Sequence, residues 1–221
     1  AAFQITLTAA VIATIFNAVY GLLMAWVLVR YEFPGKRVLD ALMDVPFALP
    51  TAVAGLSLTA LFSANGWFGA VLHPAGIPVV YTIWGIALAM AFTSVPFVVR
   101  TVQPVLEDMD PALEQAAVTL GARPWTIFTR VVFPAILPAW LAGCTTAFAR
   151  SLGEFGAIVF IAGNLPFRTE IAALLAFIRL EEFDYNGAAA IALVLLAFAL
   201  VLLLASNLLQ FWASRHREAN R

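Results

Sequence analysis

The sequence predicts an all-α integral membrane protein, a polytopic bundle of helices. Of its 221 residues, 63% are hydrophobic and only 11% are charged, and the mean hydropathy is +0.95. A soluble domain carries about 25% charged residues, so the composition of this chain matches lipid rather than water. Apolar runs recur along the chain, and about 20 apolar residues are enough to cross a bilayer as a helix.

Five apolar runs are long enough to be predicted as membrane spans, and we expect them to form a single transmembrane domain over residues 1–221. The runs cover residues 5–29, 41–62, 80–99, 136–162 and 187–211. The last of them contains IALVLLAFALVLLLA, the most lipid-like stretch of the sequence.

The basic residues orient these spans. Nine of the twelve Lys and Arg residues fall on one side of the predicted membrane: Arg30, Lys36, Arg37, Arg100, Arg123, Arg130, Arg215, Arg217 and Arg221. The positive-inside rule assigns this side to the cytoplasm, which makes the C-terminus cytoplasmic and puts residue 1 on the outer side. An outer residue 1 leads us to expect one further membrane helix before it, giving six in all.

The longest predicted cytoplasmic segment covers about residues 100–133, and we expect residues 110–134 to form an ordered helix–turn–helix. Asp110 is a predicted N-cap followed by a proline, and Gly121 is placed to end the first helix. Pro124 begins a second helix, which Pro134 is expected to close before the fourth span. A force on this segment would therefore reach a membrane helix directly.

The fourth apolar run contains two opposite charges in the stretch FARSLGEFGA. Arg150 and Glu154 are four residues apart, so on one helix they would share a face and could pair. A charge in the middle of the bilayer is costly, so we expect the pair, with Ser151 and Gly153, to face protein or the transport pathway. Three roles remain open: a structural clamp, part of a gate, or direct contact between Arg150 and a passing anion.

Prolines interrupt the second apolar run. Pro46 and Pro50 each remove a backbone donor and bend a helix. Irregular backbone is not tolerated against lipid, so these residues are expected at a pathway or an interface. The alternative is that the prolines serve local packing only.

The predicted outer side has two ordered segments: NGWFGAVLHPAGIP follows the second span, and NLPFRTEIAALLAFIRLEEFDYNG follows the fourth. Residues 169–180 are expected to form a short interfacial helix with Phe177 facing inward. Six charged residues cluster around it: Arg168, Glu170, Arg179, Glu181, Glu182 and Asp184. They are either a solvated surface or a docking site for a soluble substrate-binding protein.

Several classes of site are excluded by composition. Cys144 is the only cysteine, so no disulfide can form within the chain, and His73 and His216 lie far apart in the sequence. No P-loop motif occurs, so no nucleotide-phosphate cradle of that type is present. The net charge of −1 gives no indication of nucleic-acid binding.

The predicted cytoplasmic segment reads EQAAVTLGARPWTIFTRVVFP and resembles the EAA signature of bacterial ABC-importer permeases. Gln115 stands where the signature has its glutamate, and a glutamate comes one residue earlier. The resemblance implies that this segment couples the permease to an ATPase. The residues to which it assigns this role are Glu114, Gln115, Ala116, Ala117, Gly121 and Pro134.

The resemblance extends over nearly the whole chain. LDALMDVPFALPTAVAGL and RSLGEFGAIVFIAGN are similar to the sulfate/thiosulfate permeases of type I binding-protein-dependent ABC importers, in particular the T (also called U) subunit. This implies a MetI-like fold in the bacterial inner membrane, with no enzymatic activity in this chain. The implied partners are a W-type second permease, two copies of an ATPase that binds ATP and Mg²⁺, and a periplasmic sulfate/thiosulfate-binding protein.

Two alternatives stay open at this point. A molybdate/tungstate permease would share the RSLGEFGA-type stretch and the cytoplasmic motif. A membrane scaffold or channel without an ATPase partner would share the composition, although the motif disfavours it.

Overall fold

We analysed a computed structural model, which describes the backbone of residues 1–218 and the side chains of residues 1–201 and 204. The side chains of the basic C-terminal residues Arg215, Arg217 and Arg221 lie outside what it describes. Within residues 1–218 every regular element is a helix, as predicted. The helices are α1 (Ala2–Arg30), α2 (Lys36–Ala48), α3 (Thr51–Phe62), α4 (Gly69–Leu72), α5 (Ile83–Glu107), α6 (Pro111–Thr119), α7 (Pro124–Ile127), the π-helical η1 (Phe128–Val132), α8 (Phe133–Leu152), α9 (Gly156–Ala162), α10 (Ala172–Glu181) and α11 (Tyr185–Glu218).

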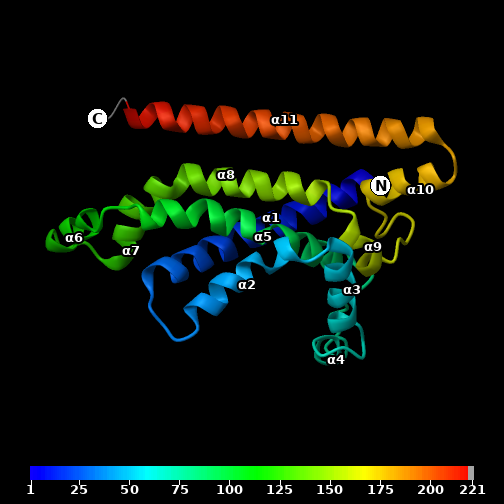
Figure 1. The fold of residues 1–221 in the computed structure, drawn as a ribbon, viewed down its shortest axis with the longest axis horizontal. Coiled ribbons are helices and arrows are strands. Elements are labelled where there is room, and N and C mark those ends of the chain that lie inside the picture. The colour runs from blue at the N-terminus through cyan, green and yellow to red at the C-terminus, as the bar shows by residue number, and fades with distance from the viewer. Residues whose placement is uncertain (219–221) are drawn as a thin grey trace.

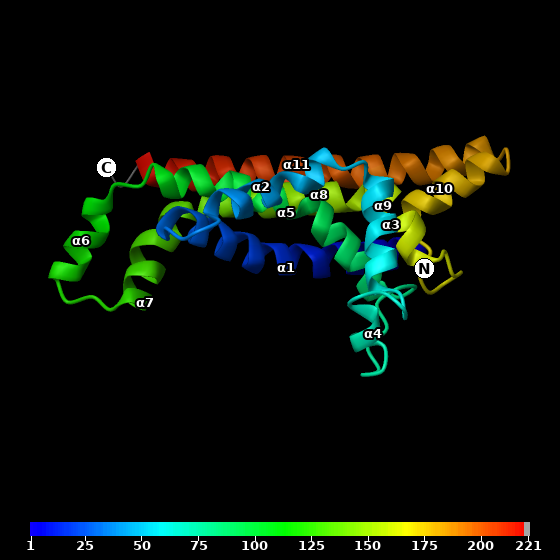
Figure 2. The ribbon, with the colours of Figure 1, turned by 60° about the horizontal axis from the view of Figure 1, so that its bottom comes forward.

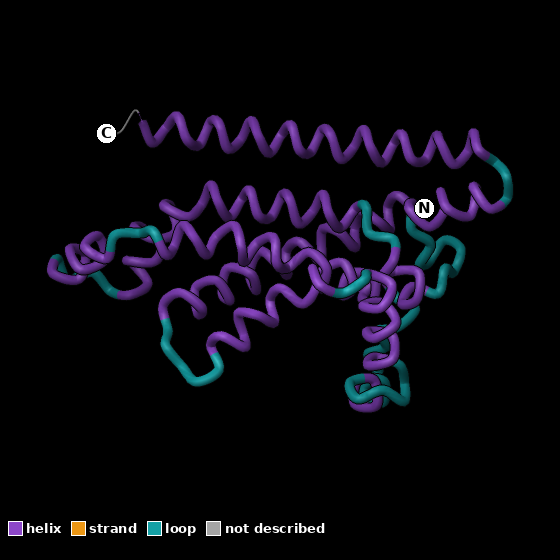
Figure 3. Tube along the Cα trace, viewed as in Figure 1, coloured by secondary structure: helices purple, strands orange, loops and turns teal. Residues whose placement is uncertain are grey.

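Four long helices, α1, α5, α8 and α11, run along the long axis of the molecule (Figures 1 and 3), and α5 packs against both α1 and α8. Helix α6 lies at one end of this bundle, whereas α9 and α10 lie at the other. Arg30 ends α1, Lys36 begins α2 and Arg123 precedes α7, so these basic residues gather at the α6 end. This grouping is the one that the charge pattern predicts.

The predicted spans are all helical, but they differ in continuity. Among the described residues, three helices are long and apolar enough to cross a membrane alone: α1, α5 and the continuous helix Pro124–Leu152. The pair α2 and α3 would make a fourth span if it is counted as one broken helix, and Tyr185–Val201 is a shorter apolar part of α11.

The apolar run of residues 41–62 is not one straight helix. Of the two bends predicted there, the one at Pro50 is confirmed, whereas Pro46 lies inside α2 without breaking it. The helix breaks between Ala48 and Thr51, and α2 and α3 are inclined by 114°. Pro50 lies at the break, where its ring disfavours helical backbone at Leu49 and its nitrogen has no hydrogen to donate. Figure 2 shows the consequence, because α3 leaves the bundle across the direction of the long helices.

The fourth predicted span is also corrected at both ends. Pro134 does not close a helix, because α7, η1 and α8 form one continuous helix from Pro124 to Leu152. The π-helical turn joins Phe133 N–H to Phe128 C=O, five residues back, and such a widened turn accommodates a proline next to it. At the other end α8 stops at Leu152, so Glu154 lies in a break before α9 rather than on the helix that carries Arg150.

Helix α10 lies close to the predicted position, as Ala172–Glu181 instead of 169–180. Leu174 is buried beneath it, but Phe177 is exposed, which corrects the prediction that Phe177 faces inward. The Phe177 ring still contacts the Phe155 ring, with centroids 5.1 Å apart.

Candidate functional site

Helix α6 has defined ends that agree with the sequence. The Asp110 carboxylate accepts a hydrogen bond from Ala112 N–H at 2.9 Å, as an N-cap does. Gly121 has φ +77°, and the following Ala122 N–H donates to Ala117 C=O at 3.0 Å. This left-handed ending favours glycine and turns the chain sharply towards α7.

The two sides of α6 have different surroundings. Glu114 forms an ion pair with Arg30 at the end of α1, and the Arg30 guanidinium lies 5.4 Å from the centre of the Trp26 ring. Gln115 and Ala116 point away from the bundle and are exposed. The glutamate displaced by one position from the EAA signature is therefore bound within the chain, whereas Gln115 faces outward.

The outward side of α6 and its flanks is apolar. Its exposed large side chains are Leu113, Val118, Leu120 and Trp125. Leu120 is 87% exposed although it sits between two ordered helices. Together with the exposed Ala116, these residues offer a surface that another protein can approach closely.

An arginine clamp, formed by Arg100 with Asp40, Asp44 and Gln103, joins α5 to α2. Arg100 Nε and Nη2 donate to the two Asp44 carboxylate oxygens at 2.8 and 2.6 Å. Arg100 Nη1 donates to Asp40 Oδ1 at 2.6 Å and to Gln103 Oε1 at 2.7 Å. The sequence analysis missed this cluster, although the spacing of Asp40 and Asp44 places both on one helix face.

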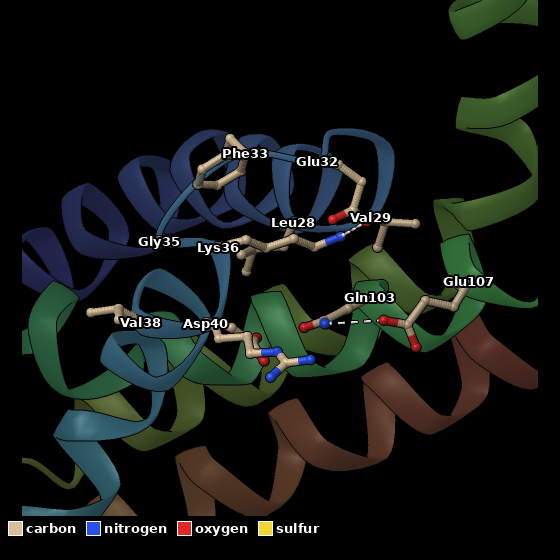
Figure 4. Close-up of a pocket in the computed structure, with 11 residues that line it drawn as sticks. Leu28, Val29, Glu32, Phe33, Gly35, Lys36, Val38, Asp40, Gln103 and Glu107 are labelled. Carbon is tan, nitrogen blue, oxygen red and sulfur yellow. Dashed lines mark hydrogen bonds and ion pairs between the residues drawn. The ribbon is translucent and has the colours of Figure 1, made fainter.

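A polar groove of about 750 Å³ lies beside the clamp, between α1, α2 and α5 (Figure 4). Lys36 in this groove donates to Glu32 at 2.6 Å, and Gln103 donates to Glu107 at 3.1 Å. These polar side chains are thus satisfied by one another. The groove opens at the same end of the bundle as the turn between α1 and α2.

The break between α8 and α9 holds the second charged cluster. Arg150 Nη1 lies 3.0 Å from Glu154 Oε2, and the side chains are 38% and 1% exposed, respectively. The other Glu154 oxygen accepts from Ala157 N–H at 3.1 Å, which caps the start of α9. The predicted pairing is confirmed, but it joins a helix end to the break that follows it. The carboxylate is buried, and part of the guanidinium remains accessible.

Ser151 belongs to a buried polar network that joins α1, α5 and α8. Its hydroxyl lies 3.1 Å from Ser94 Oγ, which also accepts from Asn17 Nδ2 at 2.8 Å. Asn17 Nδ2 donates to Ala91 C=O as well, at 3.1 Å. All three polar side chains are fully buried. Sequence reasoning selected Ser151 but missed Asn17, a lone amide inside an apolar run.

The two broken helices meet. A Cβ on Gly156 would lie 2.1 Å from Thr51 Oγ1, so the residue after Pro50 packs directly on the start of α9. Gly153 is exposed, and a Cβ there would meet only the Arg150 carbonyl oxygen, at 3.9 Å; Pro46 is buried within α2. The structure thus brings the Pro50 bend to the Arg150–Glu154 break, while α6 lies at the opposite end of the bundle.

Known proteins resemble this chain in sequence over most of its length. Residues 17–218 match the family model described as a binding-protein-dependent transport system inner membrane component. The "Sulfate transport system permease protein CysT" of Escherichia coli is 60% identical over 95% of this chain and 76% of its own length. The protein of the same name from Synechococcus elongatus is 50% identical over 98% of this chain and 78% of its own length.

Solved structures share the fold at low sequence identity. A bacterial ABC transporter involved in the import of alginate matches with a TM-score of 0.75 and 18% identity, over 95% of this chain and 77% of that one. The MetNI methionine ABC transporter in an inward-facing conformation matches with a TM-score of 0.71 and 15% identity, over 95% and 93%. With its matched residues, its relatives and its fold in agreement, the chain belongs to the family of binding-protein-dependent transport system inner membrane components.

Proposed function

We propose that this chain is a permease subunit of an ATP-driven importer that carries sulfate, and thiosulfate, across the bacterial inner membrane. The observation that carries the proposal is the 60% identity, over 95% of the chain, to a relative named as a sulfate permease. In the proposed assembly a W-type second permease completes the pathway, and a periplasmic sulfate/thiosulfate-binding protein delivers the anion. The C-terminus lies in the cytoplasm.

The α6 segment is proposed to receive one of two ATPase subunits, which bind ATP and Mg²⁺ and perform the hydrolysis. The exposed apolar side of α6 and the outward Gln115 and Ala116 support this role. Movement of α6 would reach α8 through the continuous helix that begins at Pro124. It would also reach α1 through the pair between Glu114 and Arg30.

Arg150 is proposed to contact the passing dianion. Its guanidinium meets one carboxylate among the described residues and is 38% exposed, so N–H groups remain for a second acceptor. A planar guanidinium suits an oxyanion because two N–H groups can donate in parallel. A single cation gives a weak site, and conduction needs a site that the anion can leave.

Uptake of radiolabelled sulfate, in a strain that lacks this subunit but keeps its partners, tests the proposed substrate. Expression of the chain should restore uptake, and excess thiosulfate should compete with sulfate. A molybdate or tungstate permease would instead transport its own anion without restoring sulfate uptake. Purification in mild detergent should retain the ATPase, whereas a scaffold or channel without an ATPase partner would not.

Gly121 offers a direct test of coupling. The change Gly121→Asp puts a side chain at φ +77° and a charge beside the exposed side of α6, so sulfate uptake should fall while the chain stays in the membrane. We expect the ATPase activity of the complex to persist without transport. Gly121→Asn is the matched control, because asparagine tolerates left-handed backbone better and adds no charge. Normal uptake by the Asp variant with normal ATPase binding would contradict the coupling role.

A further inference from the structure

An apolar groove runs along the surface of the bundle between α1 and the continuous helix that begins at Pro124. Its volume is about 580 Å³, and every side chain that lines it is apolar or aromatic. On α1 the lining begins at Ala18, near the middle of the helix, and ends at Tyr31, just beyond it. This stretch rises about 20 Å as a helix, and one leaflet of a bilayer contributes about 15 Å of hydrocarbon. The groove is thus long enough to hold an acyl chain of one leaflet.

The walls of the groove are fixed by contacts among aromatic side chains. Trp140 Nε1–H donates to Ala18 C=O at 2.8 Å, which joins α8 to α1. The Phe128 ring meets the Trp26 ring edge-on, with centroids 5.4 Å apart, and stacks on the Trp125 ring with centroids 5.7 Å apart. Because these rings hold one another in place, the groove is formed before any ligand enters, and binding needs little rearrangement.

An unpaired arginine stands at the polar end of the groove. Arg123 directly precedes the two residues of α7 that line the groove, and its side chain is exposed. Among the side chains that the structure describes, no carboxylate forms an ion pair with it. Glu114, the only acidic residue of α6, is already paired with Arg30. The guanidinium of Arg123 therefore keeps its N–H donors for an acceptor from outside the chain.

The groove and the arginine together match the two ends of an acidic lipid. A guanidinium can donate two parallel N–H bonds to a phosphate, and basic sites between membrane helices on the cytoplasmic side bind acidic lipid headgroups. We propose that this groove binds an anionic phospholipid of the cytoplasmic leaflet, with an acyl chain along α1 and the phosphate on Arg123. The assignment to that leaflet rests on the membrane orientation in the function proposed above. Tyr31 and the tryptophans of the groove suit the same boundary, where aromatic side chains gather at headgroup level.

Photolabelling in vesicles tests the proposal. The complete transporter is reconstituted into phosphatidylcholine vesicles that contain either phosphatidylglycerol or phosphatidylcholine with a diazirine on its acyl chain. After illumination, mass spectrometry measures which residues of this chain are labelled. We expect the phosphatidylglycerol probe to label α1 between Ala18 and Trp26 about fivefold more than the phosphatidylcholine probe does. Equal labelling by the two probes would overturn the proposal. Labelling of α1 only outside the groove, as when another protein chain covers it, would overturn it as well.

Two pairs of matched variants test the two parts of the site. Arg123→Gln should make the probes label equally, whereas Arg37→Gln, at an exposed arginine outside this groove, should keep the fivefold preference. Val19→Trp should fill the groove and lower labelling by both probes about fivefold, whereas Ile15→Trp, one turn earlier on α1 and outside the groove, should not. Val19 and Ile15 are 65% and 61% exposed, so neither change disturbs the core. Full preference in Arg123→Gln, or full labelling in Val19→Trp, would contradict the site.

The labelling needs neither ATP nor sulfate, so it is independent of transport. Sulfate uptake is measured in the same vesicles with the binding protein and ATP supplied. Absence of uptake while the lipid preference persists would contradict the proposed transport function and leave the lipid site standing. Uptake without any lipid preference would overturn the lipid site alone.

Discussion

Two arginines of this bundle, Arg100 and Arg150, sit in opposite chemical situations. Arg100 on α5 donates to two carboxylates, an amide oxygen and the Asp40 carbonyl oxygen, so all five of its N–H groups are bound by the chain. Arg150, at the end of α8, meets a single buried carboxylate and stays partly exposed. The same side chain thus serves one site that is complete without a ligand and another that can accept one.

The difference lies in the number of acceptors rather than in burial. The Arg100 side chain is 29% exposed and that of Arg150 is 38% exposed, so solvent reaches both. Asp40 and Asp44 surround Arg100 with more negative than positive charge, which would repel a dianion. At Arg150 one oxygen of the single partner, Glu154, already caps α9. The positive charge of Arg150 is thus the more available of the two.

The largest effect is expected from removing Arg150. Arg150→Ala leaves the Glu154 carboxylate buried without its cation, which should cost about 3 kcal/mol of stability and abolish most sulfate uptake. The double change Arg150→Ala/Glu154→Ala should recover most of the stability, because no charge is then stranded. Thermal unfolding of the purified complex and radiolabelled uptake measure the two quantities separately.

These two readouts separate the roles that the sequence left open. If Arg150 contacts the anion, uptake stays low in the double variant even though stability returns. Recovery of uptake together with stability would mean that the pair is a structural clamp or a gate, and that the anion does not need this guanidinium.

The next effect is expected at the arginine clamp. Arg100→Ala leaves Asp40 and Asp44 facing each other across one helical turn of α2, with no cation between them. Since the two carboxylates are partly exposed, we expect the free energy of unfolding to fall by about 2 kcal/mol, less than it would for fully buried charges. Adding Asp44→Asn should recover part of the stability, as thermal unfolding can show. An unchanged unfolding temperature in Arg100→Ala would show that α2 is held by its apolar packing alone.

The sequence predicted the long helices and the ends of α6 because those features are local. Asp110 and Gly121 act on residues within one turn, so their pattern predicts their structure. The bend at Pro50 was predicted because a proline lacks the backbone donor that a helix needs. The break after Leu152 was missed, because the hydropathy of an apolar run is the same whether its helix is straight or broken. The arginine clamp was missed for another reason: Arg100 and Asp40 are far apart in the sequence, and only packing of α2 on α5 joins them.

Replacing each arginine by lysine sharpens the comparison with a smaller effect. Lysine keeps the charge but lacks the planar guanidinium with its several N–H donors. The lysine in Arg100→Lys therefore cannot reach all the acceptors at once, and the free energy of unfolding should fall by about 1 kcal/mol. Arg150→Lys needs to satisfy only Glu154, so its stability should stay within about 0.5 kcal/mol while uptake falls through poorer contact with the anion. Thermal unfolding and uptake of both variants, measured side by side, test this contrast. Equal losses of stability at the two sites would remove the distinction between a saturated and an open arginine.

The smallest effect is expected from Ser151, one residue beyond Arg150. Ser151→Ala removes the hydroxyl that lies beside Ser94 Oγ, yet Ser94 still donates to Met90 C=O and still accepts from Asn17. Because no buried donor loses its only acceptor, the free energy of unfolding should fall by about 1 kcal/mol or less.

The same variant tests whether the network positions Arg150 by fixing the end of α8. If it does, the sulfate concentration that gives half-maximal uptake should rise modestly, while the maximal rate of uptake is unchanged. Asn17→Ala is the matched comparison, because it disconnects α1 from the same network without touching α8. If this concentration rises with Ser151→Ala but not with Asn17→Ala, Arg150 is positioned by contacts within α8 itself. If it rises with neither change, the network serves only the packing of the helices.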